Sequence, residues 1–301
     1  MVVGNKHAYL LLVHQDTLVL RRLIALIDDA RNDIFVHIDK KVKIREKIKK
    51  ELTAIPKHSN IYFLSKYRVF WGTNSIMKAE FALLERAIAG QYSYYHILSG
   101  ADLPIKPQND IHKFFEEHAG KEFIHFGTAS YQKDIQSRYN VYHFFTKQLG
   151  RKRDKKVWNM AETYSLAIQR RLHIDRLKKL DFSFYGGANW CSITNGFADY
   201  IVNNNKKYKK AFRFSQISDE AIFQTMVMDS PFQAQLYLGG YADDYKACLR
   251  YIDWNRGNPY VFRREDYDEL IKSPCMFARK FDEDIDKEII DIIYKTLREK
   301  V

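Results

Sequence analysis

Short apolar segments alternate with amphipathic segments along the first part of the chain. The apolar segments have the length of buried strands, and the amphipathic ones place apolar residues at helical spacing. The predicted strands are 7–14, 33–39, 60–64, 94–98 and 122–126, and the predicted helices are 17–27, 42–52, 75–89 and 111–118. Strands that alternate with helices favour an α/β fold with a mostly parallel sheet.

The pattern weakens between residues 130 and 181, where the chain is polar and basic and where residues 158–180 have helical spacing. A solvated insertion is one interpretation of this charge run, and a lobe that faces an acceptor or a membrane is the other. The basic residues that gather there are Lys147, Arg151, Lys152, Arg153, Lys155 and Lys156. The regular pattern returns after residue 184. There we expect helices at 195–203, 219–228 and from 282 onward, and strands at 232–238 and 249–254.

Polar residues lie at the ends of three of the predicted strands: His14, Asp39 and Asp102. Ligands of open parallel sheets bind at the carboxyl ends of the strands. These residues are therefore candidates for binding, with turn formation as the alternative.

Two adjacent cations, Arg279 and Lys280, follow an apolar segment and lie between Phe277 and Phe281. At the end of a strand they are well placed to meet an anion, and a position on the surface beside the last helix is the alternative. Glu220 is predicted in the first turn of a helix that Ser218 caps, where the helix dipole favours the ionised carboxylate.

Composition allows one large or two small domains, since 301 residues with 46% hydrophobic character can bury an ample core. The first sixteen residues are interpreted as a strand, not as a signal peptide. The three cysteines are widely spaced, which indicates neither a disulfide framework nor a zinc site and predicts a cytoplasmic protein. The net charge of +12 calls for an anionic partner: nucleic acid, an acidic membrane or a phosphorylated substrate.

Several common catalytic motifs are absent, including the Walker A loop, GxGxxG, HExxH and GxSxG. The acidic run 282–286 begins like a calcium loop, but Lys287 and Ile293 stand where that loop requires glycine and glutamate. Helix capping explains the run instead.

A series of short blocks resembles, in order, the core-2/I-branching β-1,6-N-acetylglucosaminyltransferases and peptide xylosyltransferases of glycosyltransferase family 14. The blocks are 37–40 (HIDK), 71–72 (WG), 98–106 (LSGADLPIK), 186–190 (GGANW), 218–220 (SDE), 249–256 (LRYIDWNR) and 277–282 (FARKFD). The resemblance, which is weakest at about 130–180, is to a bacterial-type member of the family. It implies one GT-A-like domain over residues 1–301. That domain would have a nucleotide-binding half at 1–129, a basic helical insertion at 130–181 and an acceptor and catalytic half at 182–301.

The resemblance also implies an inverting mechanism with a UDP-sugar donor, no cofactor and no essential metal. It assigns Glu220 as catalytic base, and Arg250, Arg279 and Lys280 to the diphosphate. The nucleotide and donor sugar would contact Val13, His14, Asp39, Trp71 and Asp102, and the acceptor would contact Arg138 and Trp190. The two tryptophans have a place in the apolar core as their alternative.

Elementary chemistry agrees with these roles. An inverting transfer needs a carboxylate to accept the proton of the attacking hydroxyl. It also needs positive charge beside the departing diphosphate, which fixed cations can supply in place of a metal.

We therefore predict metal-independent transfer of a sugar, GlcNAc or xylose, from a UDP-sugar to a hydroxyl of a glycan or a lipid-linked saccharide in bacterial surface polysaccharide synthesis. The basic insertion would rest on anionic lipid at the inner face of the cell membrane. One alternative is a metal-dependent enzyme that uses Asp102 or the pair Asp243 and Asp244. Another is a nucleic-acid-binding module built on the cluster 151–156, although no RRM, KH or helix-turn-helix signature is present.

Overall fold

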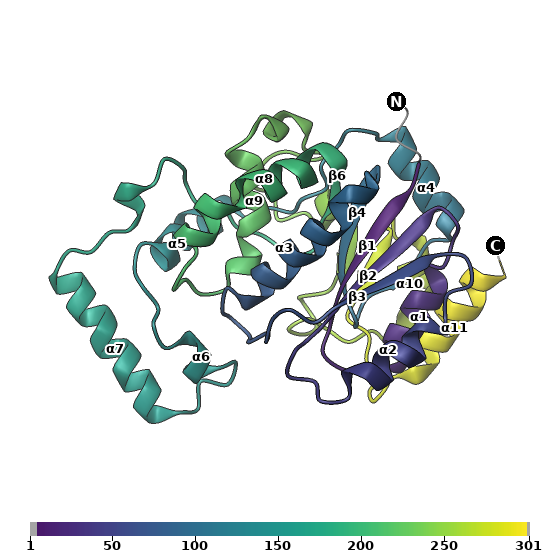
Figure 1. Ribbon diagram of the computed structural model, residues 1–301, viewed down its shortest axis with the longest axis horizontal. Coiled ribbons are helices and arrows are strands. Elements are labelled where there is room, and N and C mark those ends of the chain that lie inside the picture. Colours follow the sequence, from purple (N-terminus) through teal and green to yellow (C-terminus); the bar gives the residue numbers. More distant parts are fainter. Residues whose placement is uncertain (1–4, 300–301) are drawn as a thin grey trace.

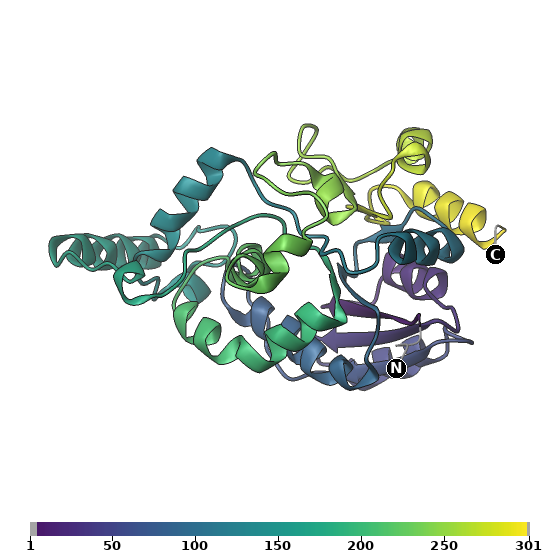
Figure 2. The ribbon, with the colours of Figure 1, turned by 90° about the horizontal axis from the view of Figure 1, so that it is seen from above.

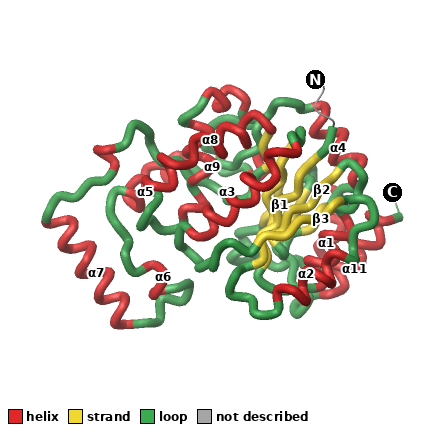
Figure 3. Tube along the Cα trace, in the orientation of Figure 1, coloured by secondary structure: helices red, strands yellow, loops and turns green. Residues whose placement is uncertain are grey.

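The computed structural model describes residues 5–299 and centres on a five-stranded sheet with the order β3-β2-β1-β4-β6 (Figures 1 and 3). Strands β1 to β4 are parallel to their neighbours, and the short β6 runs antiparallel to β4. The bounds are His7–Val13 (β1), Asn32–Ile38 (β2), Asn60–Leu64 (β3), Tyr94–Ser99 (β4) and Ser192–Thr194 (β6). The predicted α/β class with a mostly parallel sheet is confirmed.

Helices cover both faces of this sheet (Figure 3). Their bounds are Leu18–Leu26 (α1), Arg45–Thr53 (α2), Ser75–Ala87 (α3), Gln108–Glu117 (α4), Ala129–Tyr139 (α5), Thr146–Leu149 (α6), Lys156–Arg171 (α7), Asn195–Ala211 (α8), Ile222–Met228 (α9), Tyr267–Lys272 (α10) and Lys287–Arg298 (α11). N-cap side chains start several of them; for example, Thr17 accepts a hydrogen bond from the backbone of Leu20, and Asp286 accepts one from Ile289.

The central strand β1 is buried on both faces, which explains its continuous apolar run. Tyr9 and Leu11 join a core that includes residues of α1 and α11, whereas Ala8 and Leu10 join a core that includes residues of α3 and α8. The two hydrophobic cores pack against opposite faces of the sheet, and this packing fixes the positions of the strand ends.

A second, three-stranded sheet has the order β5-β8-β7, with bounds Leu103–Pro104, Phe277–Arg279 and Arg250–Ile252. The segment after β8 lies beside the segment after β4. The backbone N–H of Phe281 donates there to the carbonyl oxygen of Ala101 at 3.0 Å. This sheet therefore brings the cations of the C-terminal segment to the carboxyl end of the main sheet.

Three expected elements differ from the structure. Residues 232–238 are not a strand: Pro231–Gln235 form a 3-10 helix, whose start Ser230 caps by accepting from Phe232. The expected strand 122–126 is reduced to isolated bridges, Glu122 with Leu236 and Phe123 with Ser192. The expected helix 219–228 is split into a 3-10 turn, Ser218–Glu220, and α9, and the Ser218 side chain caps neither.

Residues 130–181 form the helical insertion, built from α5, α6 and α7, and α7 lies far from the sheet in both ribbon views (Figures 1 and 2). The helix expected at 158–180 is α7, which ends earlier, at Arg171. Helix α5, whose N-cap Thr128 accepts from Tyr131, was not expected from the sequence. No helix within residues 5–299 has the length and apolar character needed to cross a membrane.

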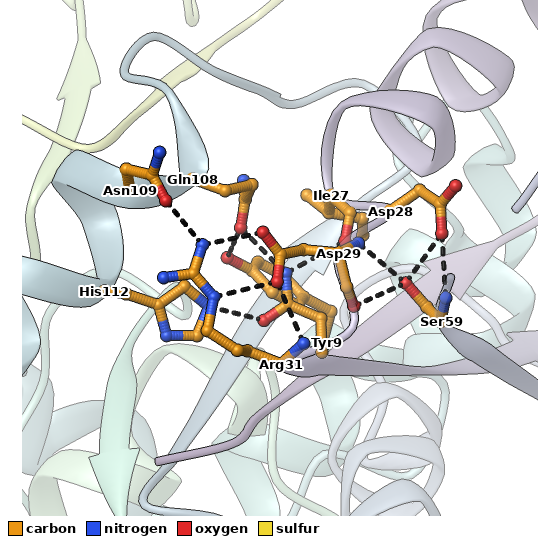
Figure 4. A network of polar contacts seen from close by, with 10 residues as sticks. Tyr9, Ile27, Asp28, Asp29, Arg31, Ser59, Gln108, Asn109 and His112 are labelled. Atoms are coloured by element: carbon orange, nitrogen blue, oxygen red, sulfur yellow. Dashed lines mark hydrogen bonds and ion pairs between the residues drawn. The ribbon is translucent and has the colours of Figure 1, made fainter. Parts of the chain in front are cut away.

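A polar network lies at the amino end of β2 (Figure 4). Arg31 donates to both carboxylate oxygens of Asp29, at 2.8 and 2.7 Å, and to Asn109 at 2.8 Å. Close by, the hydroxyl of Tyr9 donates to Gln108 at 3.1 Å. These bonds tie the loop before β2 to α4, and the Arg31 guanidinium lowers the pKa of Asp29 to about 2.

Candidate active site

The end of β2 is held by Asp39. Its backbone N–H donates to the carbonyl oxygen of Val13 at 2.8 Å, while its Oδ1 accepts from the backbone N–H groups of Lys41 and Val69 at 2.8 and 3.2 Å. The Lys41 ammonium lies 3.3 Å from Oδ2. Asp39 is therefore a turn former in this structure, at the strand end where a binding role was predicted.

His14 follows β1 and lies within electrostatic reach of Lys280. Burial lowers the pKa of His14, Asp39 raises it, and Lys41 and Lys280 lower it. The Lys280 side chain is half-buried and makes no hydrogen bond or ion pair with any residue of the described range 5–299. A cation without an internal partner thus stands at the carboxyl end of the sheet.

Arg279 is a nearly buried cation whose donors are incompletely used. Its Nη1 lies 3.5 Å from Oδ1 of Asp102, which is an ion-pair distance, and has no hydrogen-bond partner among the described residues. The guanidinium carbon stands 4.1 Å above the centre of the Trp190 ring. Asp102 also accepts from the backbone and hydroxyl of Ser99, at 2.6 and 3.1 Å. Burial lowers the pKa of Arg279 and Asp102 opposes this shift, so the site holds a cation suited to a further anion.

Arg250 is held mainly by contacts within the protein, although its Nε has no hydrogen-bond partner among the described residues. Its side chain is 1% exposed, and Nη1 donates to the Ser192 hydroxyl at 2.7 Å. The other acceptors are the backbone carbonyls of Ile97, Cys191 and Cys248. These contacts fix β7 against β4 and β6, and the predicted contact of Arg250 with the diphosphate stays a prediction.

Glu220 ends the 3-10 turn before α9, where Arg138 and Tyr131 of α5 face it. Oε2 of Glu220 lies 3.7 Å from Nη1 of Arg138, and the Glu220 side chain is 43% exposed. The surrounding protein raises the pKa of Glu220 by desolvation, while Arg138 and Tyr131 lower it. The predicted influence of a helix dipole is therefore outweighed, and the higher pKa makes this carboxylate a stronger proton acceptor.

Two more carboxyl groups, Asp219 and Glu80, are buried near Glu220. Burial raises the pKa of Asp219 to about 7 and raises that of Glu80, with Asp219 as the next contribution to the Glu80 shift. Asn189 donates to Oε1 of Glu80 at 2.7 Å, whereas Oε2 of Glu80 and Oδ1 of Asp219 lack hydrogen-bond partners. The sequence analysis missed Glu80, although a charged residue between apolar Ala79 and Phe81 of α3 was a usable signal.

The loop 186–190 connects the cations with the carboxylates. Its Gly187 donates a backbone hydrogen bond to the carbonyl oxygen of Glu220 at 2.9 Å. A Cβ on Gly187 would stand 2.0 Å from the carbonyl oxygen of His125, so only glycine permits this close approach. Trp190, at the end of the loop, stacks on Arg279.

Tyr245 stacks on His125 with the ring centres 4.0 Å apart, and it has weak electrostatic interactions with Glu220 and with Arg279. The direct contacts come from the loop 186–190, through Gly187 to the backbone of Glu220 and through Trp190 to Arg279. Sequence reasoning missed Tyr245, which has no distinguishing neighbour pattern.

Trp71 lies at the surface beside the insertion. Its side chain is 45% exposed, and the residue lines a small hollow with Thr146 and Arg153. The carbonyl oxygen of the next residue, Gly72, accepts a hydrogen bond of 2.8 Å from the backbone N–H of Ile217. Ile217 directly precedes the turn that carries Glu220. The predicted contact of Trp71 with the donor stays a prediction.

Metal ligands were an open alternative. Within residues 5–299, no three side chains of histidine, cysteine, aspartate or glutamate are grouped to hold a metal ion. Asp243 lies 3.1 Å from Nε2 of His125, and Asp102 is engaged by Ser99 and Arg279. All three cysteines are buried as free thiols.

Comparison with known proteins places these residues in a family context. "Xylosyltransferase sqv-6" of Caenorhabditis briggsae is 25% identical over 281 residues, which cover 85% of this chain and 32% of the relative. "Xylosyltransferase 2" of Mus musculus is 22% identical over 314 residues, which cover 95% of this chain and 33% of the relative. The solved structure of mouse Xyloside xylosyltransferase 1 covers 90% of this chain and 96% of that chain at 10% identity, with a TM-score of 0.38.

The chain thus spans about a third of the length of these curated relatives. Both relatives are animal proteins, and the predicted bacterial type finds no support in them. The family described as "Branch: Core-2/I-Branching enzyme" matches residues 7–278. The predicted family is therefore confirmed, and the chain belongs to the Core-2/I-branching enzymes.

Proposed function

We propose that the protein is an inverting glycosyltransferase that moves a sugar from a UDP-sugar to a hydroxyl group of a glycan acceptor without an essential metal. Membership of a branching-enzyme family supports the reaction class. The observation that carries the proposal is the incompletely paired cation Arg279, which the loop 186–190 links to the turn that carries Glu220.

The chemistry assigns one task to each charge. Glu220 accepts the proton of the acceptor hydroxyl, and the oxygen of that hydroxyl forms a bond to the anomeric carbon of the donor. The bond from this carbon to the diphosphate oxygen breaks at the same time. UDP leaves with the bonding electrons. Arg279 and Lys280 stabilise its developing negative charge, as Asp102 holds the guanidinium in place.

The remaining assignments follow the shape of the site. Val13, His14 and Asp39 end the two central strands, and we assign the nucleotide to this edge. GlcNAc or xylose is the proposed donor sugar. The proposed acceptor, a glycan or a lipid-linked saccharide of a bacterial surface polysaccharide, would enter beside Arg138 and Trp190.

A thermal-shift experiment tests the proposal. UDP, UDP-GlcNAc and UDP-xylose are added with EDTA or with manganese, and we expect the unfolding temperature to rise equally under both conditions. Lys280→Met should remove most of that rise, whereas the control Lys113→Met, at a 75% exposed side chain on α4, should not. A rise that requires manganese would contradict the metal-free mechanism, and the absence of any rise would contradict UDP-sugar binding.

A further inference from the structure

Helix α7, Lys156–Arg171, turns its apolar side away from the protein. Four large apolar residues follow one another at intervals of three or four positions, which places them on one side of the helix, and a fifth follows its end. They are Val157 (74% exposed), Met160 (58%), Tyr164 (66%), Ile168 (58%) and Leu172 (65%). In a helix that stabilises a fold through its amphipathic face, large apolar residues such as these are buried in the core.

The inward side of α7 combines polar contacts with an aromatic one, in which the half-buried Trp158 lies with its ring centre 5.6 Å from that of Phe145. The two buried residues of this helix are Glu162 and Gln169. Nδ1 of His143 lies 2.6 Å from a Glu162 oxygen, and Gln169 exchanges hydrogen bonds of 2.8 and 2.7 Å with the backbone of Tyr142. Because these bonds set the rotation of the helix, the outward position of the apolar stripe is built into the fold.

Exposed cations stand at both ends of the stripe. They are Arg151, Lys152, Arg153, Lys155 and Lys156 before it, and Arg170, Arg171, Lys178 and Lys179 after it. Cations at the start of a helix oppose its dipole, so the first group does not stabilise α7. Both ribbon views show α7 at the outer end of the insertion, away from the sheet (Figures 1 and 2).

We propose that this side of α7 docks on the surface of a bilayer that contains anionic lipid. The apolar stripe would enter the boundary between headgroups and acyl chains, and the cations at its ends would meet lipid phosphates. An anionic bilayer offers a counterpart to both parts of the surface, acyl chains for the apolar stripe and phosphates for the cations. A second copy of the chain would bring two basic clusters together, and a nucleic acid would leave the apolar stripe in water.

This docking does not depend on the proposed sugar transfer. The same insertion carries Arg138 of α5, which faces Glu220, so a docked α7 would hold the proposed acceptor side near the membrane. That arrangement suits an acceptor attached to lipid.

Cosedimentation of the whole chain with vesicles tests the apolar part. We expect binding to phosphatidylcholine vesicles that contain phosphatidylglycerol, weak binding to phosphatidylcholine alone, and release by salt. Ile168→Glu should weaken binding by roughly tenfold or more. Ile44→Glu is the matched control, because Ile44 is also 58% exposed but precedes α2, and it should bind like the parent chain.

A pair of double variants tests the basic part. Lys152→Glu with Lys155→Glu should weaken binding by about fivefold or more for each position. Lys47→Glu with Lys113→Glu changes the net charge equally at side chains that are 71% and 75% exposed elsewhere, and should leave binding unchanged. All variants replace exposed residues, so thermal unfolding should match that of the parent chain.

Several results would overturn the proposal. Equal binding by Ile168→Glu and Ile44→Glu would show that α7 is not the contact, and equal binding to both vesicle types would remove the role of anionic lipid. A dimer in the parent chain that Ile168→Glu converts to a monomer, without vesicle binding by either, would assign the surface to a second copy.

Discussion

The two ends of the five-stranded sheet both gather charged side chains, but the contacts of these side chains differ. At the amino end, Arg31 reaches both oxygens of Asp29 and a further acceptor on Asn109. At the carboxyl end, Arg279 has one carboxylate at 3.5 Å, and its Nη1 makes no hydrogen bond to a described residue.

The difference separates structural charges from charges that await a ligand. An ion pair with several direct hydrogen bonds, such as that of Arg31 with Asp29, stabilises the fold, whereas a nearly buried cation with an unused donor lowers stability until an anion arrives. The amino-end network therefore belongs to the scaffold, and the carboxyl end is where binding is expected. Four substitutions test this comparison.

Of the four substitutions, Glu220→Gln should have the largest effect, a fall in the rate of sugar transfer. The amide keeps the shape of the side chain but cannot accept the proton, so kcat should fall by roughly 10²–10⁴-fold while UDP still raises the unfolding temperature. The control is Glu117→Gln on α4, with a 57% exposed side chain, which should keep the full rate. Unchanged turnover in Glu220→Gln would remove the proposed base.

Arg279→Met should lower kcat by about 10²–10³-fold, since one stabilising group is lost from the leaving diphosphate. The matched variant at the other end is Arg31→Met, which should lower the unfolding temperature and leave kcat of the folded protein unchanged. Steady-state kinetics and thermal unfolding of both proteins are measured together. If Arg31→Met were the slower enzyme, the division between scaffold and site would be reversed.

Asp219→Asn should change the pH dependence of stability. The folded pKa of Asp219, about 7, is above its ordinary value, so its stabilising contribution is complete below about pH 4 and is lost as the pH rises through 7. The neutral amide avoids this loss, and the variant should gain roughly 1–3 kcal/mol over the parent at pH 8. Denaturant unfolding at pH 5 and pH 8 measures the change, and a variant less stable than the parent at pH 8 would contradict it.

Asp29→Asn should have the smallest effect, with the opposite dependence on pH. The folded pKa of Asp29, about 2, is below its ordinary value, so its contribution is present above about pH 4 and is lost as the pH falls toward 2. After allowance for solvent screening we expect a loss of about 1 kcal/mol at pH 7. Unfolding at pH 7 and pH 2 measures it, and an equal loss at both values would show that the ion pair is not its source.

Periodicity was sufficient to predict β1 to β4 of the main sheet, because these strands are largely apolar, but it did not predict the short β6. The same pattern failed at 232–238, where alternating apolar residues follow Pro231 and a serine cap favours a tight turn. Local sequence does not show which acceptors surround a side chain in three dimensions.

Arg250 shows that limit most clearly. Its place in a family block predicted contact with a diphosphate, and the sequence did not show that carbonyl groups from distant parts of the chain, at Ile97 and Cys191, also converge on its guanidinium. Glu80 shows the converse, because only the folded chain brings α3 beside the turn that carries Asp219. Contacts between residues far apart in the sequence, such as these, arise only when the chain folds.

The stacking of Arg279 on Trp190 gives the protein an intrinsic optical reporter. The guanidinium covers one face of the indole at 4.1 Å, so any movement of Arg279 toward an incoming anion changes the environment of the chromophore. Trp190 is one of four tryptophans, so comparing the parent chain with a variant that replaces the other three would isolate its emission as a reporter of occupancy at this edge of the sheet.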